Sequence, residues 1–586
     1  MSCYAQLPQA LPNAGTQATH NPSRKTKPSS SRIYWLGATV CCGGLLFGYD
    51  SGVIGGVLTF ASFHDSFRYT PQEQTLISSI AVGIQQAGAL AGCLLIWPLT
   101  THYGRRRSMI LCSLIFCIGV IFEIINSHSL PIFYIGRIIC GLGIGGSATV
   151  APIYLAEMSP AHLRGRLGSG YQFTFTVGIF VSYWIDYGVQ YWEESARQWQ
   201  VPLALQLVPG IAMGLGMLPL KESVRWLIAS GDTRAAWESL AWIRNADSAG
   251  NGDDSALAVR DEFAEMKRAV DADTSATADF QPRELLHRPN LRRVSLAVSI
   301  FIAQQATGAT AMAYFGPQFF GLLVGEPSSP AASSNATEAI TTVSGESAHS
   351  LTLLLTGIFG ALKVLSCLFF ILFVADRFGR KPLLTFGALA MALCMISTSL
   401  VLHSSSPPLS SPASPSSPTS LSATQIFTIL LIYLTITLYN LSWGPLPWPL
   451  VAELFPTRLR SPGVALAVAS QWTSNFIWSF ATPYILRGLG WATFLLFGLL
   501  DLGIVLFVVM CLPETAGRSL EEVEELFDDR RYSGRDGECD GEDGLDAESE
   551  GLVRGFIERE EGGEDYEGWK AGGTVQSPQP TTSRYT

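Results

Sequence analysis

The chain has 586 residues, of which 48% are hydrophobic and only 15% are charged, and its formal net charge is −10. This composition is too apolar for a water-soluble protein of such length, so we expect a membrane protein. Residues 514–586 contain 21 acidic and 8 basic residues, a net charge of −13, which leaves +3 for the rest of the chain. The negative charge is therefore that of a tail, and it does not point to a nucleic-acid partner.

Twelve apolar runs are long enough to cross a hydrocarbon core of ~30 Å as helices of about 20 residues. They cover residues 33–58, 75–98, 108–126, 132–152, 168–188, 200–220, 294–322, 350–375, 382–402, 425–448, 463–486 and 490–512. Six runs fall within residues 33–220 and six within residues 294–512. We therefore predict an all-α membrane protein with two groups of six transmembrane helices.

Polar segments precede, separate and follow the two groups of runs. Residues 1–32 and most of 513–586 have compositions typical of disordered tails, with a short acidic helix predicted at 520–526. Residues 221–293 have patterned stretches at 232–244 and 256–270, which predict short amphipathic helices.

The short loops predict the orientation in the membrane. Loops after the second, fourth, eighth and tenth runs carry ten Lys and Arg, whereas the loops on the other side carry three. Positive charge marks the cytoplasmic side, so we expect both termini in the cytoplasm. The sequon at Asn335 lies in a loop predicted to be extracellular, where it is a candidate for glycosylation.

Short charged motifs recur in the two halves. The motif from Glu157 to Arg164 returns at Glu453 to Arg460, with Glu, Pro, Leu and Arg at the same spacing. Gly-Arg-Arg at 104–106 returns as Gly-Arg-Lys at 379–381, and residues 219–225 loosely match 513–518. The offsets are 275, 296 and 294 residues, which one insertion in the Ser- and Pro-rich run 404–422 explains. The chain is thus predicted to be an internal duplication with pseudo-symmetric halves.

The repeated motifs place cations and carboxylates at the same helix ends. Arg105, Arg106 and Arg380 can meet Glu157 and Glu453 there. Such clusters can lock the inner ends of the helices in one conformation and release them in another. The alternative is that these cations only set the topology.

Two charges are predicted inside the membrane near its middle and outer half. Asp50 lies in the first run and Arg137 in the fourth. An ion in lipid is unfavourable and usually functional, and a carboxylate that loses its Arg partner takes up a proton. We therefore expect Asp50 and Arg137 to form a proton-coupling pair, with a purely structural ion pair as the alternative.

The second half contains a further buried cation and an interrupted helix. Lys363 lies 13 residues before Asp376, about 20 Å along a helix, which is too deep to reach the cytoplasm easily. It can receive a substrate carboxylate or pair with a protein acceptor.

Three prolines at 445, 447 and 449 predict a bend or break in the tenth span. Trp443 is expected in the interfacial aromatic belt.

Taken together, Gly48-Tyr49-Asp50, Gly104-Arg105-Arg106, residues 157–164 and residues 376–381 resemble the signature motifs of the sugar porter family of the major facilitator superfamily. The stretches 184–189, 198–202 and 356–363 are most similar to its fungal quinate permease branch. The resemblance implies two six-helix bundles around a central cavity and transport by alternating access, without enzymatic activity. Thr101 and Val224 depart from the family pattern, which puts the strength of the first half's gating contacts in doubt.

The resemblance also implies roles for individual residues. The expected substrate-binding residues are Phe47, Gln172, Gln304, Gln305, Thr310, Tyr314, Lys363, Trp448, Gln471 and Trp472. The expected gating salt-bridge network contains Arg105, Arg106, Glu157, Arg164, Glu222, Arg225, Asp376, Arg380, Glu453 and Arg460. Amide side chains donate and accept hydrogen bonds at once, as polyhydroxylated rings require.

These observations predict a plasma-membrane transporter that couples protons to the import of quinate or a related polyhydroxylated carboxylic acid. We expect it to act as a monomer in the lipid bilayer, with no cofactor or metal other than the proton as coupling ion. A hexose or pentose symporter or facilitator is the nearest alternative. A nutrient receptor that binds substrate without moving it is an alternative of another class.

Overall fold

The computed structural model describes residues 31–70, 72–125, 128–245, 254–277, 282–324, 338–374, 377–405, 422–455, 457–514 and 527. Asn335, Asp376, the predicted acidic helix at 520–526 and most of both tails lie outside the described residues. The side chains of Arg164 and Arg460 lie outside them too. The predictions for these residues therefore stay predictions.

The first half is built from long helices joined by short loops. Its helices are α1 (Ser31–Val57), α2 (Ala61–Phe67), α3 (Gln74–Tyr103), α4 (Arg105–Ile124), α5 (Leu130–Met158), α6 (Ala161–Val189), α7 (Arg197–Leu205) and α8 (Leu207–Met217). The predicted sixth span is interrupted between α7 and α8. Pro209 has no N–H for the carbonyl of Leu205, which accounts for this break.

Three helices follow in the segment between the halves. They are α9 (Val224–Ala229), α10 (Thr233–Ile243) and α11 (Asp254–Thr277). The side chain of Asp232 accepts a hydrogen bond from the backbone N–H of Ala235 at 3.0 Å and caps α10. The two amphipathic helices predicted here are confirmed as α10 and α11, although α11 is longer than predicted.

The second half has more interruptions than the first. It contains α12 (Arg288–Ala306), α13 (Ala309–Tyr314), α14 (Gly316–Val324), α15 (Glu338–Phe369), α16 (Arg380–Ser405), α17 (Ala423–Leu441), α18 (Pro447–Glu453), α19 (Thr457–Leu489) and α20 (Ala492–Cys511). The predicted proline break separates α17 from α18. A second break, which was not predicted, lies at Gly308, where φ is +77° and an added Cβ would lie 2.7 Å from the Phe497 ring.

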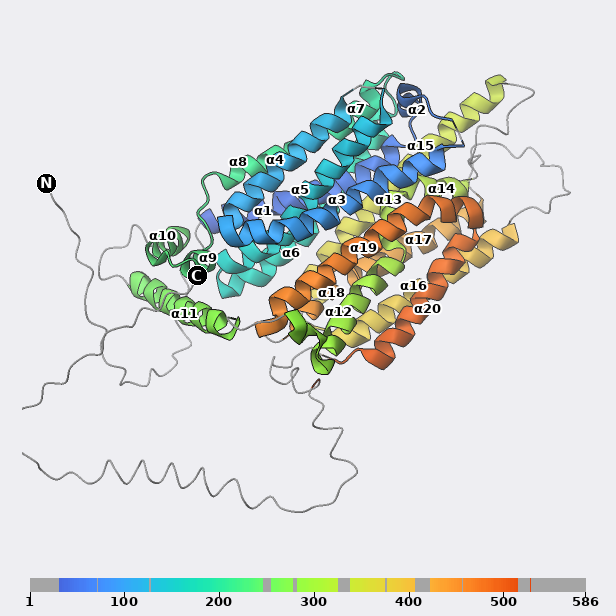
Figure 1. Ribbon diagram of the computed structural model, residues 1–586. Coiled ribbons are helices and arrows are strands. Elements are labelled where there is room, and N and C mark those ends of the chain that lie inside the picture. Colours follow the sequence, from blue (N-terminus) through green and yellow to red (C-terminus); the bar gives the residue numbers. More distant parts are fainter. Residues whose placement is uncertain are drawn as a thin grey trace, which may run out of the picture. The chain divides into compact units, whose positions relative to one another are not determined.

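The packing of the helices follows the internal duplication. The pair α1 and α6 in the first half corresponds to α12 and α19 in the second, and α3 with α5 corresponds to α15 with α17. Across the halves, α3 packs on α19 and α6 packs on α15 (Figure 1). At Gly145 an added Cβ would overlap the Ala89 carbonyl oxygen, so glycine is needed where α5 meets α3.

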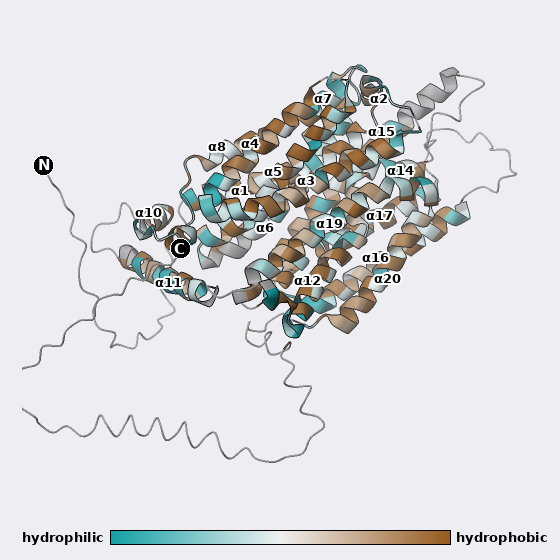
Figure 2. Ribbon diagram, viewed as in Figure 1, coloured by the Kyte–Doolittle hydropathy of each residue, from teal (hydrophilic) through white to brown (hydrophobic). Residues whose placement is uncertain are grey.

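Nine helices among the described residues are long and apolar enough to cross a membrane. Figure 2 shows hydrophobic residues along the long helices, and many large ones, such as Leu95, Leu215 and Leu365, are exposed. Outward-facing leucines suit a surface in lipid. The other predicted spans are α6, α19 and the interrupted α12 to α14, which carry the polar cavity residues described next.

Candidate functional site

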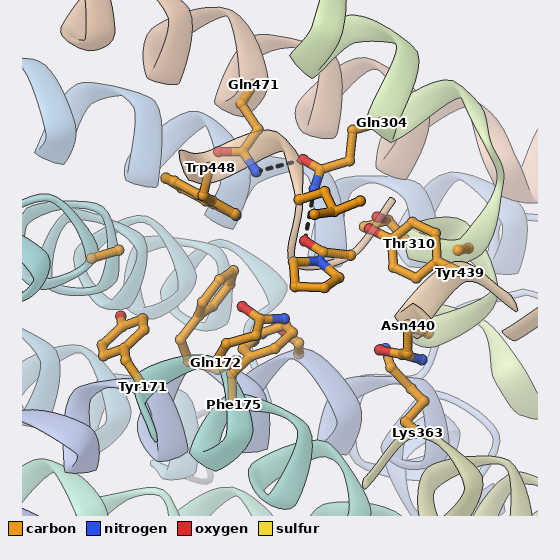
Figure 3. A pocket seen from close by; sticks show the side chains of 18 of the residues that line it. Tyr171, Gln172, Phe175, Gln304, Thr310, Lys363, Tyr439, Asn440, Trp448 and Gln471 are labelled. Atoms are coloured by element: carbon orange, nitrogen blue, oxygen red, sulfur yellow. Dashed lines mark hydrogen bonds between the residues drawn. The ribbon is translucent and has the colours of Figure 1, made fainter. Parts of the chain in front are cut away.

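A cavity of about 510 Å³ lies between the two halves (Figure 3). Its walls come from α1, α5 and α6 of the first half and from α12, α13, α15, α16, α17, α18 and α19 of the second. All ten residues predicted to bind substrate line this one cavity: Phe47, Gln172, Gln304, Gln305, Thr310, Tyr314, Lys363, Trp448, Gln471 and Trp472. Their contact with a substrate stays a prediction.

The amide of Gln304 joins the broken tenth span to the cavity wall. Its Nε2 donates to the carbonyl oxygens of Trp443 at 2.9 Å and Gly444 at 3.2 Å, where the break between α17 and α18 frees backbone acceptors. Gln471 Nε2 donates to Gln304 Oε1 at 3.1 Å. Because its amide is held on both sides, Gln304 presents a fixed polar surface to the cavity.

Three polar atoms of residues that line the cavity have no hydrogen-bond partner among the described residues. The hydroxyl of Tyr171, Oε1 of Gln305 and Nε1 of Trp472 are buried and have no hydrogen-bond partner among the described residues. An unsatisfied buried polar group costs about 1–3 kcal/mol. Each atom is almost fully shielded in this conformation, so a hydroxylated ligand would reach it only after the side chain turns toward the cavity. Tyr171 was not predicted, because an aromatic residue in an apolar run gives no sign of the direction in which it points.

Aromatic rings form one face of the cavity. The ring centroid of Phe47 lies 4.7 Å from that of Phe175 and 5.4 Å from that of Trp472. Trp448 is 37% exposed and packs edge-on against Phe301 at 5.2 Å. Such rings can cover the C–H surface of a cyclic substrate.

Trp443 is not part of an interfacial belt, and that prediction was wrong. Its side chain is fully buried, and its Nε1 donates to the Leu384 carbonyl at 2.9 Å. The proline break turns the backbone inward at this residue, so that Trp443 anchors the break to α16.

Lys363 is the buried cation of the cavity. Its side chain is 4% exposed, and its Nζ lies 5.9 Å from the Phe175 ring centroid and 6.0 Å from that of Phe359. No hydrogen bond or ion pair joins this ammonium to a described residue. In Figure 3 it lies across the cavity from Gln304 and Gln471. Of the two interpretations left open by the sequence, this geometry favours a ligand over a protein acceptor.

The predicted coupling pair is in contact. Arg137 Nη1 donates to Asp50 Oδ1 at 2.7 Å, and both side chains are fully buried. The rest of the guanidinium is held by Gln85 Oε1 at 2.6 Å and by the Ala81 carbonyl at 3.0 Å. Gln85 also donates to Asp50. The pair therefore lies in a closed network in which every guanidinium nitrogen has an acceptor.

A second carboxylate shares Arg137 and was not predicted. Glu123 Oε1 lies 3.5 Å from Arg137 Nη1, and Glu123 is also fully buried. Its other oxygen accepts a hydrogen bond from Gln206 Nε2 at 3.3 Å. An acidic residue inside the apolar run 108–126 was a signal that the sequence did contain.

Gln86 connects the coupling pair with the cavity. Its Nε2 donates to the Tyr314 hydroxyl at 2.9 Å and lies 3.4 Å from Gln85 Oε1, and Asn475 Nδ2 donates to its Oε1 at 3.2 Å. Tyr314 and Asn475 line the cavity in the second half, whereas Gln86 belongs to α3 in the first. These bonds cross between the halves and close the cavity at this end.

Ion pairs hold the helix ends in the first half. Arg105 Nε and Nη2 each donate to Glu157 at 2.9 Å, a bidentate pair. Glu222 accepts from the backbone N–H of Arg105 at 2.7 Å and of Arg106 at 3.0 Å, so it caps the start of α4. Arg225 forms no ion pair with a described residue, and its place in the gating network stays a prediction.

The second half repeats the arrangement. Arg380 Nη2 lies 3.2 Å from Glu453 Oε1. Glu514 accepts from the backbone N–H of Arg380 at 3.0 Å and of Lys381 at 3.1 Å, and thus caps α16 as Glu222 caps α4. Glu514 was not among the predicted gating residues, although the loose match of residues 513–518 to 219–225 indicated it. We call this end of the bundle, with Arg105 and Arg380, the basic end.

The cavity extends toward the basic end. Its lining includes Leu155 near the end of α5 and Arg380 at the start of α16. At its other end the bonds of Gln86 to Tyr314 and Asn475 join the halves. The structure therefore has a central cavity, largely apolar with a few polar groups, that extends toward the basic end and has hydrogen bonds between the halves at its other end.

Known proteins are similar to this chain in sequence and in fold. Residues 36–527 match the family described as "Sugar (and other) transporter". The chain is 31% identical to the quinate permease of Emericella nidulans, over 85% of this chain and 89% of that protein. It is 30% identical to a probable quinate permease of Neosartorya fischeri, over 85% and 88%.

A solved structure has the same arrangement of helices. The partially occluded, inward-open xylose transporter XylE from E. coli superimposes with a TM-score of 0.65 at 24% identity, covering 84% of this chain and all of that one. The fold is therefore the major facilitator fold that the sequence predicted. By its family match and by these permease relatives, the chain belongs to the sugar transporter family, and it is a multi-pass membrane transporter and not an enzyme.

Proposed function

We propose that this protein imports quinate or a similar polyhydroxylated carboxylic acid across the plasma membrane, driven by protons. It would act as a monomer, with the proton as coupling ion and no other cofactor. The observation that carries the choice of substrate is Lys363, a buried ammonium on the cavity wall with no acidic partner among the described residues. Relatives named as quinate permeases support the same class of substrate.

The chemistry of the cavity suits such an acid. A substrate carboxylate would compensate the charge of Lys363, whose burial is otherwise unfavourable. Once their side chains turn toward the cavity, Gln305 Oε1, Trp472 Nε1 and the Tyr171 hydroxyl would bond to the ring hydroxyls, because they lack partners among the described residues. A neutral hexose would satisfy the same three atoms but would leave the ammonium uncompensated.

Proton coupling would operate at Asp50. While Asp50 is ionised it holds Arg137, and when it is protonated the guanidinium is free to turn away. Gln85 and Gln86 link this event to Tyr314 on the cavity wall. A change at Asp50 would thus reach the contacts that close the cavity.

The orientation follows from the positive charges of the loops. We place the basic end and both termini in the cytoplasm. The described conformation is then one that releases substrate inward, since the cavity extends to the basic end and is closed at the other.

Competition for uptake tests the proposed substrate. The full chain, purified and placed in lipid vesicles, should take up labelled quinate, and hydroxylated carboxylic acids should inhibit this uptake far better than neutral sugars. Accumulation against a gradient should require an inward proton gradient and should be lost in Asp50→Asn, with exchange at equal pH retained. Uptake of a labelled hexose that outcompetes quinate would contradict the proposal.

A further inference from the structure

Glu123 is a fully buried carboxyl group with few partners. Its Oε1 lies 3.5 Å from Arg137 Nη1 but accepts no hydrogen bond from a described residue, and its Oε2 accepts from Gln206 at 3.3 Å. The Cys140 thiol is a further, weak donor to this carboxyl group. Asp50, by contrast, accepts hydrogen bonds from both Arg137 and Gln85. One guanidinium is therefore shared unequally by two acids.

The charges of this cluster do not balance when both acids are ionised. Among the described residues, the charged or titratable groups that face Glu123 are Arg137 and Cys140 of α5 and Asp50 of α1. Gln206, between α7 and α8, adds only a neutral amide. Two carboxylates and one guanidinium leave a net charge of −1 in a site without water access, which is strongly unfavourable. The cluster is therefore expected to hold one proton.

The hydrogen bonds indicate which acid holds it. The stronger donors are at Asp50, where a guanidinium and an amide both donate, so this carboxylate is favoured in its ionised form. Glu123 has one long hydrogen bond from an amide, a weak thiol donor, and an Oε1 without a hydrogen-bond partner among the described residues that can carry the proton. Arg137 Nη1 is only 0.8 Å farther from Glu123 than from Asp50 (3.5 Å against 2.7 Å), so a small turn of the guanidinium exchanges its partners.

We infer that Glu123 is a second proton-binding site of this transporter, which is protonated while Asp50 is ionised and becomes the counterion of Arg137 when Asp50 takes up a proton. This inference rests on the proposed proton coupling. One O–H bond forms at Asp50, with a proton taken from one side of the membrane, as the one at Glu123 breaks. The proton of Glu123 leaves to the other side when the conformational change gives the cluster access to water, so one proton is moved while the net charge of the cluster stays at zero. Proton uptake then avoids leaving a buried guanidinium without a counterion.

The test is the pH dependence of coupled uptake by the full chain in vesicles. Glu123→Gln fixes the group in an uncharged form, so protonating Asp50 would leave Arg137 uncompensated. The external pH for half-maximal accumulation should fall by about 1–3 units, the size of shift that a nearby charge produces. Exchange at equal pH should persist, and Glu123→Asp should restore most of the wild-type profile.

Two further variants separate this role from a structural one. Gln206→Leu removes the donor that favours ionised Glu123, so it should shift the profile in the same direction by a smaller amount, and it provides the test if Glu123→Gln does not fold. Asp186→Asn is the matched control, because Asp186 is also a fully buried carboxyl but lies on α6 without a cation partner among the described residues. Its profile should equal that of the wild type.

The possible results distinguish the inference from the proposed function. A wild-type profile in both Glu123→Gln and Gln206→Leu, with accumulation lost in Asp50→Asn, would overturn the role of Glu123 and leave the coupling at Asp50 intact. If the wild-type protein itself accumulates substrate without regard to the proton gradient, the proposed coupling fails, and the role of Glu123 fails with it.

Discussion

Replacing Lys363 by methionine removes the ammonium from the cavity and keeps nearly the same side-chain length. Lys363 is 4% exposed, so water screens its charge poorly, and a substrate carboxylate at its Nζ would form a charge-assisted hydrogen bond. Losing a hydrogen bond to a charged group costs about 1.5–3 kcal/mol. At 1.4 kcal/mol per factor of ten, the affinity for the acid should fall by about 10- to 150-fold.

The assay compares two inhibitors on two proteins. Inhibition constants for a hydroxylated ring acid and for the same ring without its carboxylate are measured against labelled uptake, in the wild type and in Lys363→Met. The acid should lose affinity and the neutral polyol should change less than about 2-fold, so the difference isolates the pair of charges. Thermal unfolding provides the control for folding, since removal of an unpaired buried charge should not destabilise the protein. Equal losses for both inhibitors would refute the assignment of Lys363 as the carboxylate site.

Three other changes test separate parts of the structure. Gln86→Leu removes the hydrogen bonds to Tyr314 and Asn475 that join the two halves, each worth about 1 kcal/mol. In a Thr310→Cys background, an impermeant thiol reagent applied from outside should then label the cavity cysteine more strongly. Unchanged labelling would mean that these bonds do not close the cavity. Gly145→Leu should lower the free energy of unfolding, measured by calorimetry, by about 1–3 kcal/mol. Gly503→Leu is the control and should not lower it, because Gly503 has open space around it. Equal effects of the two changes would contradict the close packing of α3 and α5. Glu514→Gln should destabilise the start of α16 by about 1 kcal/mol, because it removes the carboxylate charge that caps this helix. Amide hydrogen exchange should become faster at residues 380–384 but not at residues 105–109. An equal increase in both places would argue against a local cap.

The sequence predicted the helices well because the thickness of a membrane sets their length. Twelve apolar runs of the right length correspond to the long helices and interrupted helices of the structure, and the loop motifs identified the duplication. The break before Pro447 was predicted because proline lacks an N–H. The break at Gly308 was not, since glycine is tolerated within membrane helices and only the Phe497 ring beside it shows why it is required.

The candidate site was predicted where the residue type alone carries the chemistry. Asp50, Arg137 and Lys363 are charges in apolar runs, and the structure brings the first two together and leaves the third on the cavity wall. Glu123 is likewise an acidic residue in an apolar run, and it was overlooked although the sequence contained this signal. The contacts of Glu123 with Arg137 and of Gln86 with the second half depend on which faces of α4 and α3 turn inward, and these mostly apolar helices do not reveal it.

The contacts of Glu514 show that the second bundle needs residues that follow its last helix, α20. Glu514 lies beyond α20, yet it holds the first turn of α16, and a little farther along Phe527 is buried with the guanidinium of Arg293 5.0 Å from its ring centroid. A ribosome must therefore have passed both positions before the second bundle can complete these contacts at its basic end. Gene truncations or fluorescent fusions placed after residue 527 should preserve trafficking and transport, whereas a stop codon at 513 should leave a protein that quality control removes.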